Sequence, residues 1–80
     1  MTLDAILSEV GDEVSRAEEK FPPFNSAHEG WAVIREEVDE LWDAVRLNMG
    51  DGAGARMEAV QIAAMAIRYL RDVSNQESKP

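Results

Sequence analysis

Apolar residues recur along the chain at three- and four-residue steps, the spacing that places side chains on one face of an α-helix. This pattern predicts a first helix over Thr2–Lys20 and a second helix that begins after Ser26. Thr2 and Ser26 are suitable N-caps, and Glu29 follows Ser26 at the spacing of a capping box. The two apolar stripes consist of Leu3, Ile6, Leu7, Val10, Val14, Ala17 and Phe21, and then of Trp31, Ile34, Val38, Leu41, Trp42, Val45 and Met49.

Prolines and glycines separate the predicted helices. Pro22 and Pro23 end the first helix because two successive prolines cannot continue it. Gly50 is the expected left-handed cap of the second helix, and a third helix is predicted from residues 53–56 to about Val73. No segment alternates as a strand does. The sequence therefore predicts an all-α domain of three antiparallel helices over residues 1–73, followed by a polar, disordered tail over residues 74–80.

The third predicted helix is unusually apolar. From Met57 to Leu70, eleven of fourteen residues are apolar, and the polar residues are Glu58, Gln61 and Arg68. These three fall on one arc of the helix, so about two-thirds of its circumference is apolar. Such a helix is buried on several sides, and two companion helices can hardly cover it. We therefore expect it to pack against another subunit.

Composition excludes several classes of protein. The chain has 80 residues and a net charge of −8, which argues against a nucleic-acid partner because phosphates are bound by Lys and Arg. No apolar run approaches the roughly 18 residues of a membrane span, and no signal peptide opens the chain, so no membrane partner is expected. The absence of cysteine excludes disulfides and thiolate chemistry and favours the cytoplasm. A domain this small usually needs a metal or oligomerisation.

Carboxylates gather in the second predicted helix between Glu36 and Asp43. Glu37 and Glu40 are three residues apart and therefore neighbours on one face, and Glu58 and Gln61 repeat this spacing in the third helix. An antiparallel hairpin that turns near residues 51 and 52 brings Glu40 within about 3 Å, along the axis, of the level of Gln61. The four side chains can then converge. Several oxygen ligands without His or Cys suit Mg²⁺ or Mn²⁺.

Two simpler interpretations of these acids stay open. The carboxylates of the second helix can form an ordinary solvated face. Glu58, in its apolar setting, is costly to desolvate unless it is paired, and a salt bridge to Arg35, Arg56 or Arg68 would satisfy it equally well.

Further side chains are candidates for contacts with a nucleotide. Lys20, Arg56 and Arg68 are suited to phosphate, and Arg68 shares the polar arc of Glu58, although an ion pair with Asp72 is an alternative. For His28 an exposed or capping role competes with base recognition, and for Trp31 and Trp42 core packing competes with base stacking.

The segments Glu37-Val-Asp-Glu40 and Glu58-Ala-Val-Gln61, separated by seventeen residues, carry a family resemblance. They resemble the paired motif E-x-x-E and E-x-x-D of the MazG-like, all-α nucleoside triphosphate pyrophosphohydrolases. Similarity to small phage and bacterial members covers roughly residues 20 to 73 and includes the segment from Pro22 to Gly30. The resemblance implies a homodimer or homotetramer whose four-helix-bundle cores are shared between subunits.

The resemblance also implies Mg²⁺-dependent cleavage of a nucleoside or deoxynucleoside triphosphate into monophosphate and pyrophosphate. Glu37, Glu40 and Glu58 would be the metal ligands, and Glu36 would orient or deprotonate the attacking water or hold a second ion. Gln61 departs from the family motif, which has Asp here, and would be a neutral, weaker ligand. The alternative is a non-catalytic helical oligomer that binds a nucleotide or a protein partner. Because six of the sixteen acids lie between residues 29 and 43, any phosphate ligand is expected to arrive with metal.

Overall fold

The structure is a computed structural model that describes residues 1–47 and 53–74. These residues form three α-helices and contain no strand: α1 (Leu3–Lys20), α2 (Ala27–Arg46) and α3 (Ala53–Tyr69). A π-helical turn, η1 (Leu70–Ser74), follows α3 directly. The predicted all-α class and the three predicted helices are confirmed. No helix of the described residues is long and apolar enough to cross a membrane.

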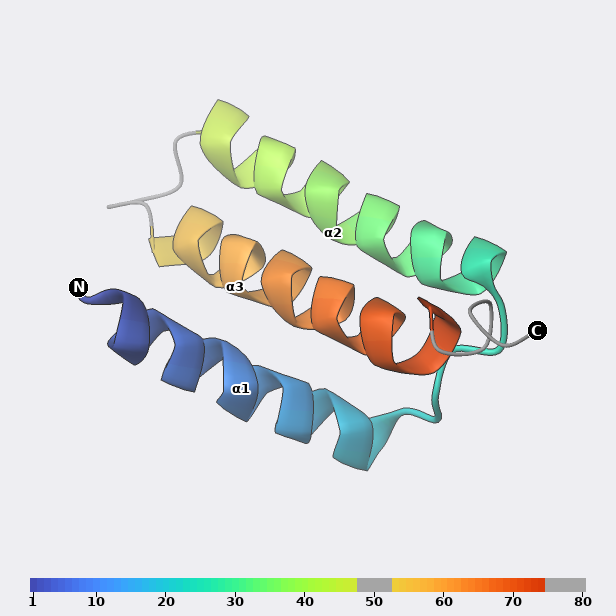
Figure 1. Ribbon diagram of the computed structural model, residues 1–80. Coiled ribbons are helices and arrows are strands. Elements are labelled where there is room, and N and C mark those ends of the chain that lie inside the picture. The colour runs from blue at the N-terminus through green and yellow to red at the C-terminus, as the bar shows by residue number, and fades with distance from the viewer. Residues whose placement is uncertain (48–52, 75–80) are drawn as a thin grey trace.

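The central element of the fold is α3, which lies between α1 and α2 and packs against both (Figure 1). Along the ribbon α1 and α3 run in the same direction and α2 runs in the opposite one (Figure 1). The end of α1, the beginning of α2 and the end of α3 therefore meet at one end of the molecule. This arrangement agrees with the predicted sequence of antiparallel helices.

Local side-chain contacts fix the beginnings of α1 and α2. The Thr2 hydroxyl accepts a hydrogen bond from the Ala5 amide, and the Ser26 hydroxyl accepts one from the Glu29 amide, each at 3.1 Å. Both predicted N-caps are confirmed. The Glu29 carboxylate accepts from the Asn25 amide at 2.9 Å, one residue before the position that a capping box uses.

The end of α3 differs from the prediction of a regular helix to Val73. The α-helical pattern ends at Tyr69, and η1 continues the chain to Ser74, which the sequence had placed in the tail. Asp72 lies in this turn, and its carboxylate accepts a hydrogen bond from the Phe24 amide at 3.1 Å. The turn thus fastens the end of α3 to the loop between α1 and α2. The predicted cap at Gly50 and the remainder of the tail lie outside the described residues.

Within the chain, α1 and α2 cover part of α3. Ala64 is fully buried, and the core is completed by Val10, Val14, Ala17, Phe24, Val60, Met65 and Val73. Met57, Ala59 and Ala66 of α3 are exposed, and Ile62 and Ile67 are half-buried. The two companion helices therefore leave part of the apolar surface of α3 uncovered, and the packing of α3 against another subunit stays a prediction.

Exposed apolar side chains also lie on α1, at Leu3 and Leu7, and on α2. Trp31 and Trp42 are 58% and 59% exposed, and Val38 and Val45 are exposed with them. The prediction that the two tryptophans pack in the core is wrong for the single chain. The face of α2 that packs on α3 contains the buried Gly30, which lies against Tyr69.

Candidate metal centre

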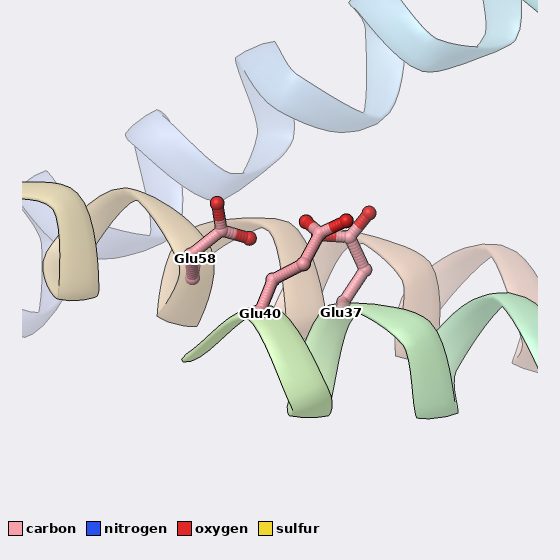
Figure 2. Close-up of side chains that lie close together, drawn as sticks. All are labelled: Glu37, Glu40 and Glu58. Carbon is pink, nitrogen blue, oxygen red and sulfur yellow. The ribbon is translucent and has the colours of Figure 1, made fainter. Parts of the chain in front are cut away.

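Three carboxylates converge between α2 and α3. Glu37 and Glu40 lie on successive turns of α2, and Glu58 lies on the second turn of α3, which packs beside them. One carboxylate oxygen from each residue lies within 4.8 Å of the other two. Figure 2 shows the three side chains pointing toward one another. The predicted convergence of these residues is confirmed by this geometry.

Two of the three carboxylates are partly withdrawn from solvent. Glu37 and Glu58 are half-buried, and the Oε2 atom of each is shielded from solvent without a hydrogen-bond partner among the described residues. A buried polar atom without a partner costs free energy, and the cost is larger for a charged group. The site therefore holds two oxygen acceptors that residues 1–47 and 53–74 leave without a hydrogen-bond donor.

The electrostatics of the cluster favour protonation of Glu37 and Glu40. Burial, as the largest cause, and the neighbouring carboxyl groups of Glu58 and Glu40 together raise the pKa of Glu37 to about 7. The pKa of Glu40 is also raised, first by burial and then by Glu58 and the charge of Glu36. Like charges at this separation disfavour joint ionisation. A divalent cation would reverse that balance because it stabilises all three ionised forms.

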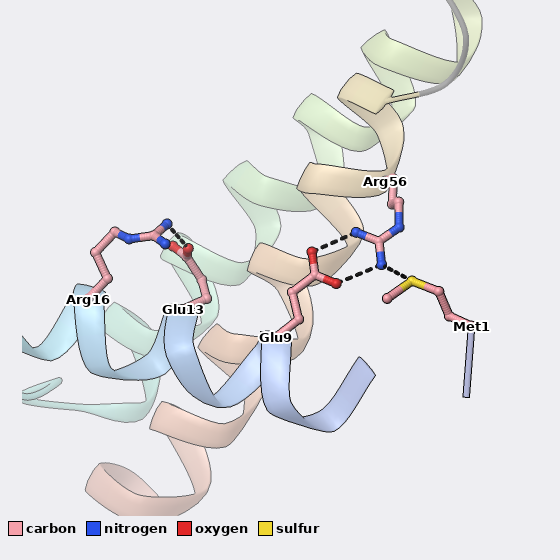
Figure 3. Close-up of polar contacts among 5 residues, drawn as sticks. All are labelled: Met1, Glu9, Glu13, Arg16 and Arg56. Atoms are coloured by element: carbon pink, nitrogen blue, oxygen red, sulfur yellow. Dashed lines mark hydrogen bonds and ion pairs between the residues drawn. The ribbon is translucent and has the colours of Figure 1, made fainter. Parts of the chain in front are cut away.

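None of the three arginines considered as a partner for Glu58 reaches it. Arg35 pairs with Asp39 at 3.3 Å. Arg56 pairs with Glu9 through two nitrogen–oxygen contacts of 2.6 Å (Figure 3). Arg68 donates to the Pro22 carbonyl at 2.9 Å. The salt-bridge explanation for Glu58 is therefore wrong, and the carboxylate cluster remains.

A groove of about 590 Å³ extends from this cluster along α3. Gln61, Met65 and Arg68 line it from successive turns of α3. Glu36 and Glu37 line it from α2, so both face the same space as Gln61. The remaining lining residues are Glu13, Arg16, Ala17, Lys20, Phe21, Pro22, Phe24, Glu29 and Val33.

No protein-family model, curated protein or solved structure matches the chain. Its function must therefore be inferred from the chemistry of the carboxylates and the groove.

The predicted phosphate- and base-binding residues divide into two groups. Lys20 and Arg68 line the groove, whereas His28 and Arg56 do not, and Arg56 is held by Glu9 on α1. The alternative ion pair between Arg68 and Asp72 is not formed, since Asp72 accepts the Phe24 amide instead.

Arg16 is a groove residue that the sequence reasoning missed. It lies four residues before Lys20 on α1, so both cations occupy one face of that helix. The four-residue spacing of the two cations could have indicated a shared face. The sequence alone does not show that this face lines a groove. Arg16 also forms an ion pair with Glu13, another lining residue (Figure 3).

The donor set fits a hard divalent cation. Carboxylate oxygens are the ligands that Mg²⁺ and Mn²⁺ prefer, and two of those present lack any other partner. Gln61 lies one turn beyond Glu58 on α3 and faces the adjoining groove, where its amide oxygen is available as a neutral ligand. The cluster can thus bind a cation at the edge of a space large enough for a small ligand.

Proposed function

We propose that the protein is a Mg²⁺-dependent nucleoside or deoxynucleoside triphosphate pyrophosphohydrolase, with Mn²⁺ able to replace Mg²⁺. The observation that carries this proposal is the convergence of Glu37, Glu40 and Glu58 within 4.8 Å at the edge of the groove. The resemblance of the two E-x-x-[E/Q] segments to the MazG-like motif supports the same activity. The products would be a nucleoside monophosphate and pyrophosphate.

Each residue has a distinct task in this proposal. Glu37, Glu40 and Glu58 hold the cation, which supplies charge neutralisation at phosphoryl oxygens and lowers the pKa of bound water. Glu36 faces the groove and accepts the proton of the attacking water. The water oxygen bonds to the α-phosphorus, the bond from that phosphorus to the bridging oxygen breaks, and pyrophosphate leaves with that oxygen.

Self-association is part of the proposal. The exposed side chains Trp31, Val38, Trp42 and Val45 share one face of α2, and large exposed aromatic side chains are typical of interfaces. A second copy of the chain is the partner that we propose for this face, in a dimer or tetramer. A cytoplasmic location also belongs to the proposal, because the chain has no cysteine.

A second candidate function rests on Gln61. An amide at this position supplies no negative charge to a cation, so the site has three carboxylates where the family motif has four. This favours a non-catalytic helical oligomer that binds a nucleotide or a protein partner through the same groove. The two candidates make opposite predictions for turnover.

Pyrophosphate release distinguishes them. The purified protein is incubated with a panel of ribo- and deoxyribonucleoside triphosphates, with Mg²⁺, Mn²⁺ or EDTA. We expect release that depends on the cation, that Glu40→Gln abolishes and that Glu19→Gln, a change to an exposed acid of α1, leaves intact. No release from any triphosphate would contradict hydrolysis and favour the binding protein. Full turnover by Glu40→Gln would contradict the ligand assignment.

A further inference from the structure

Arg68 is a buried cation without an anionic partner. Its side chain is 2% exposed, and it forms no ion pair with a carboxylate among the described residues. Nη2 donates to the Pro22 carbonyl at 2.9 Å, and the guanidinium lies 4.5 Å from the centre of the Phe24 ring. Within the described part of the chain, Nη1 reaches only the Met65 sulfur, at 3.6 Å, and Nε has no acceptor. A buried guanidinium normally has a carboxylate or several oxygen acceptors.

The nearby acids are engaged elsewhere. Asp72 accepts the Phe24 amide, and Glu29 accepts the Asn25 amide. Glu13 pairs with Arg16. None of these acids forms an ion pair with Arg68 among the described residues.

The groove is electrostatically divided along its length. Arg68 is seven residues beyond Gln61 on α3, about 10 Å along the axis. At the Arg68 end Lys20 and Arg16 line the groove from α1, whereas Glu36 and Glu37 line it beside Gln61. Three cations thus line one end together with Glu29, and about two helical turns separate Arg68 from the level of Glu36 and Glu37.

We propose that the Arg68 end of the groove is an anion subsite that binds a phosphate group without a metal ion. A guanidinium donates directed hydrogen bonds to phosphate oxygens. Three neighbouring cations also match a ligand with several negative charges, such as a phosphate, better than a ligand with one carboxylate. The subsite is distinct from the cluster of Glu37, Glu40 and Glu58. It does not depend on the proposed hydrolysis, because a phosphate bound there needs neither cation nor turnover.

Calorimetric titration of pyrophosphate into the protein in EDTA tests the subsite. We expect saturable binding that Arg68→Gln weakens by about tenfold or more, as for the loss of a charged donor. Lys20→Gln, at an exposed position that does not threaten folding, should weaken binding roughly two- to fivefold. Arg35→Gln, an exposed arginine of α2 outside the groove, should leave it unchanged.

The absence of pyrophosphate binding in EDTA would overturn the subsite. Equal pyrophosphate affinity in the wild type and in the folded Lys20→Gln and Arg68→Gln variants would overturn it as well.

A non-hydrolysable nucleoside triphosphate, added in EDTA, identifies the source of the phosphate. Competition with pyrophosphate indicates a phosphate group of the nucleotide, and lack of competition indicates a free anion; either result supports a phosphate subsite. Pyrophosphate binding in a protein that shows no Mg²⁺-dependent turnover would contradict the proposed hydrolysis but not the subsite. Mg²⁺-dependent turnover in a protein that does not bind pyrophosphate in EDTA would contradict the subsite but not the hydrolysis.

Discussion

At the scale of single residues, Glu37 is the most informative side chain. It lies beside two other carboxyl groups, is half-buried, and has one oxygen without a partner among the described residues. These conditions are unfavourable for an ionised carboxylate and favourable for a cation ligand. The metal-free protein therefore carries an electrostatic cost in the cluster that a cation relieves.

This cost predicts a pH dependence of stability. The pKa of Glu37 is about 7 in the folded protein, whereas the ordinary value for a glutamate, which applies to the unfolded chain, is 4.5. Between pH 4.5 and pH 7 the folded state therefore binds more protons than the unfolded state. Stability should therefore fall as pH rises from about 4.5 to about 7. Thermal denaturation in EDTA measures this fall, and Glu37→Gln should remove much of it.

The Glu9–Arg56 ion pair does not obscure this measurement. Its hydrogen bond lowers the pKa of Glu9, so the associated stability is present above pH 4.5 and is lost only as pH falls through the lowered value. A melting temperature that stays constant or rises between pH 4.5 and 7 would contradict the account of Glu37.

At the scale of elements, the sequence predicted the helices well and their orientation less well. The N-caps Thr2 and Ser26 are local features, and the structure shows them as expected. The apolar stripe of α2 faces inward only in part, because Ile34 packs against the core whereas Trp31 and Trp42 are exposed. The face of α2 that lies closest to α3 contains Gly30.

The groove could not be predicted from local patterns either. Its shape depends on how α1 and α2 are placed around α3, and on the turn η1 that ties Asp72 to Phe24. Arg68 was a candidate because it shares an arc with Glu58, yet its burial follows from the loop at Pro22. Contacts between residues more than forty positions apart determine this part of the site.

The contact between α2 and α3 at Gly30 predicts a specific sensitivity. A Cβ atom at this position would lie 2.6 Å from Cδ2 of Tyr69 and 3.3 Å from the Phe24 ring. Gly30→Ala should therefore destabilise the protein by about 1–3 kcal/mol through overpacking. For a domain of this size, each 1 kcal/mol lowers the melting temperature by about 4–8 °C.

Gly11→Ala is the matched control. Gly11 is an exposed position inside α1, and a Cβ atom there would meet nothing within 4 Å. Because alanine is the better helix former, this change should stabilise the protein by about 0.5–1 kcal/mol. Equal effects of the two substitutions in urea denaturation would show that close packing at Gly30 is not what matters.

At the scale of the whole molecule, the chain leaves an apolar face of α2 uncovered. Trp42 lies in the middle of this face, between Val38 and Val45, and all three are exposed. Trp42→Gln should shift the protein from oligomer toward monomer, measured by light scattering over a range of concentrations. Leu70→Gln, a change to an exposed side chain of η1 outside this face, should have no such effect. A wild-type protein that is monomeric throughout would contradict association through α2.

The charge of the whole chain bears on the same site. Six of its sixteen acids lie between residues 29 and 43, and the net charge is −8. A triphosphate approaching this surface is repelled unless cations accompany it. The structure adds that two of these six, Glu37 and Glu40, lie close enough to Glu58 to share one cation with it.

Binding of Mn²⁺ measured by calorimetry tests the central claim, that Glu37, Glu40 and Glu58 form one cation site. We predict saturable binding to the wild type and to Glu19→Gln. Glu58→Gln should weaken it by at least about tenfold, since even the loss of a group that only supports a ligand has an effect of that size. Absence of binding to the wild type, or equal affinity in Glu58→Gln, would contradict the claim.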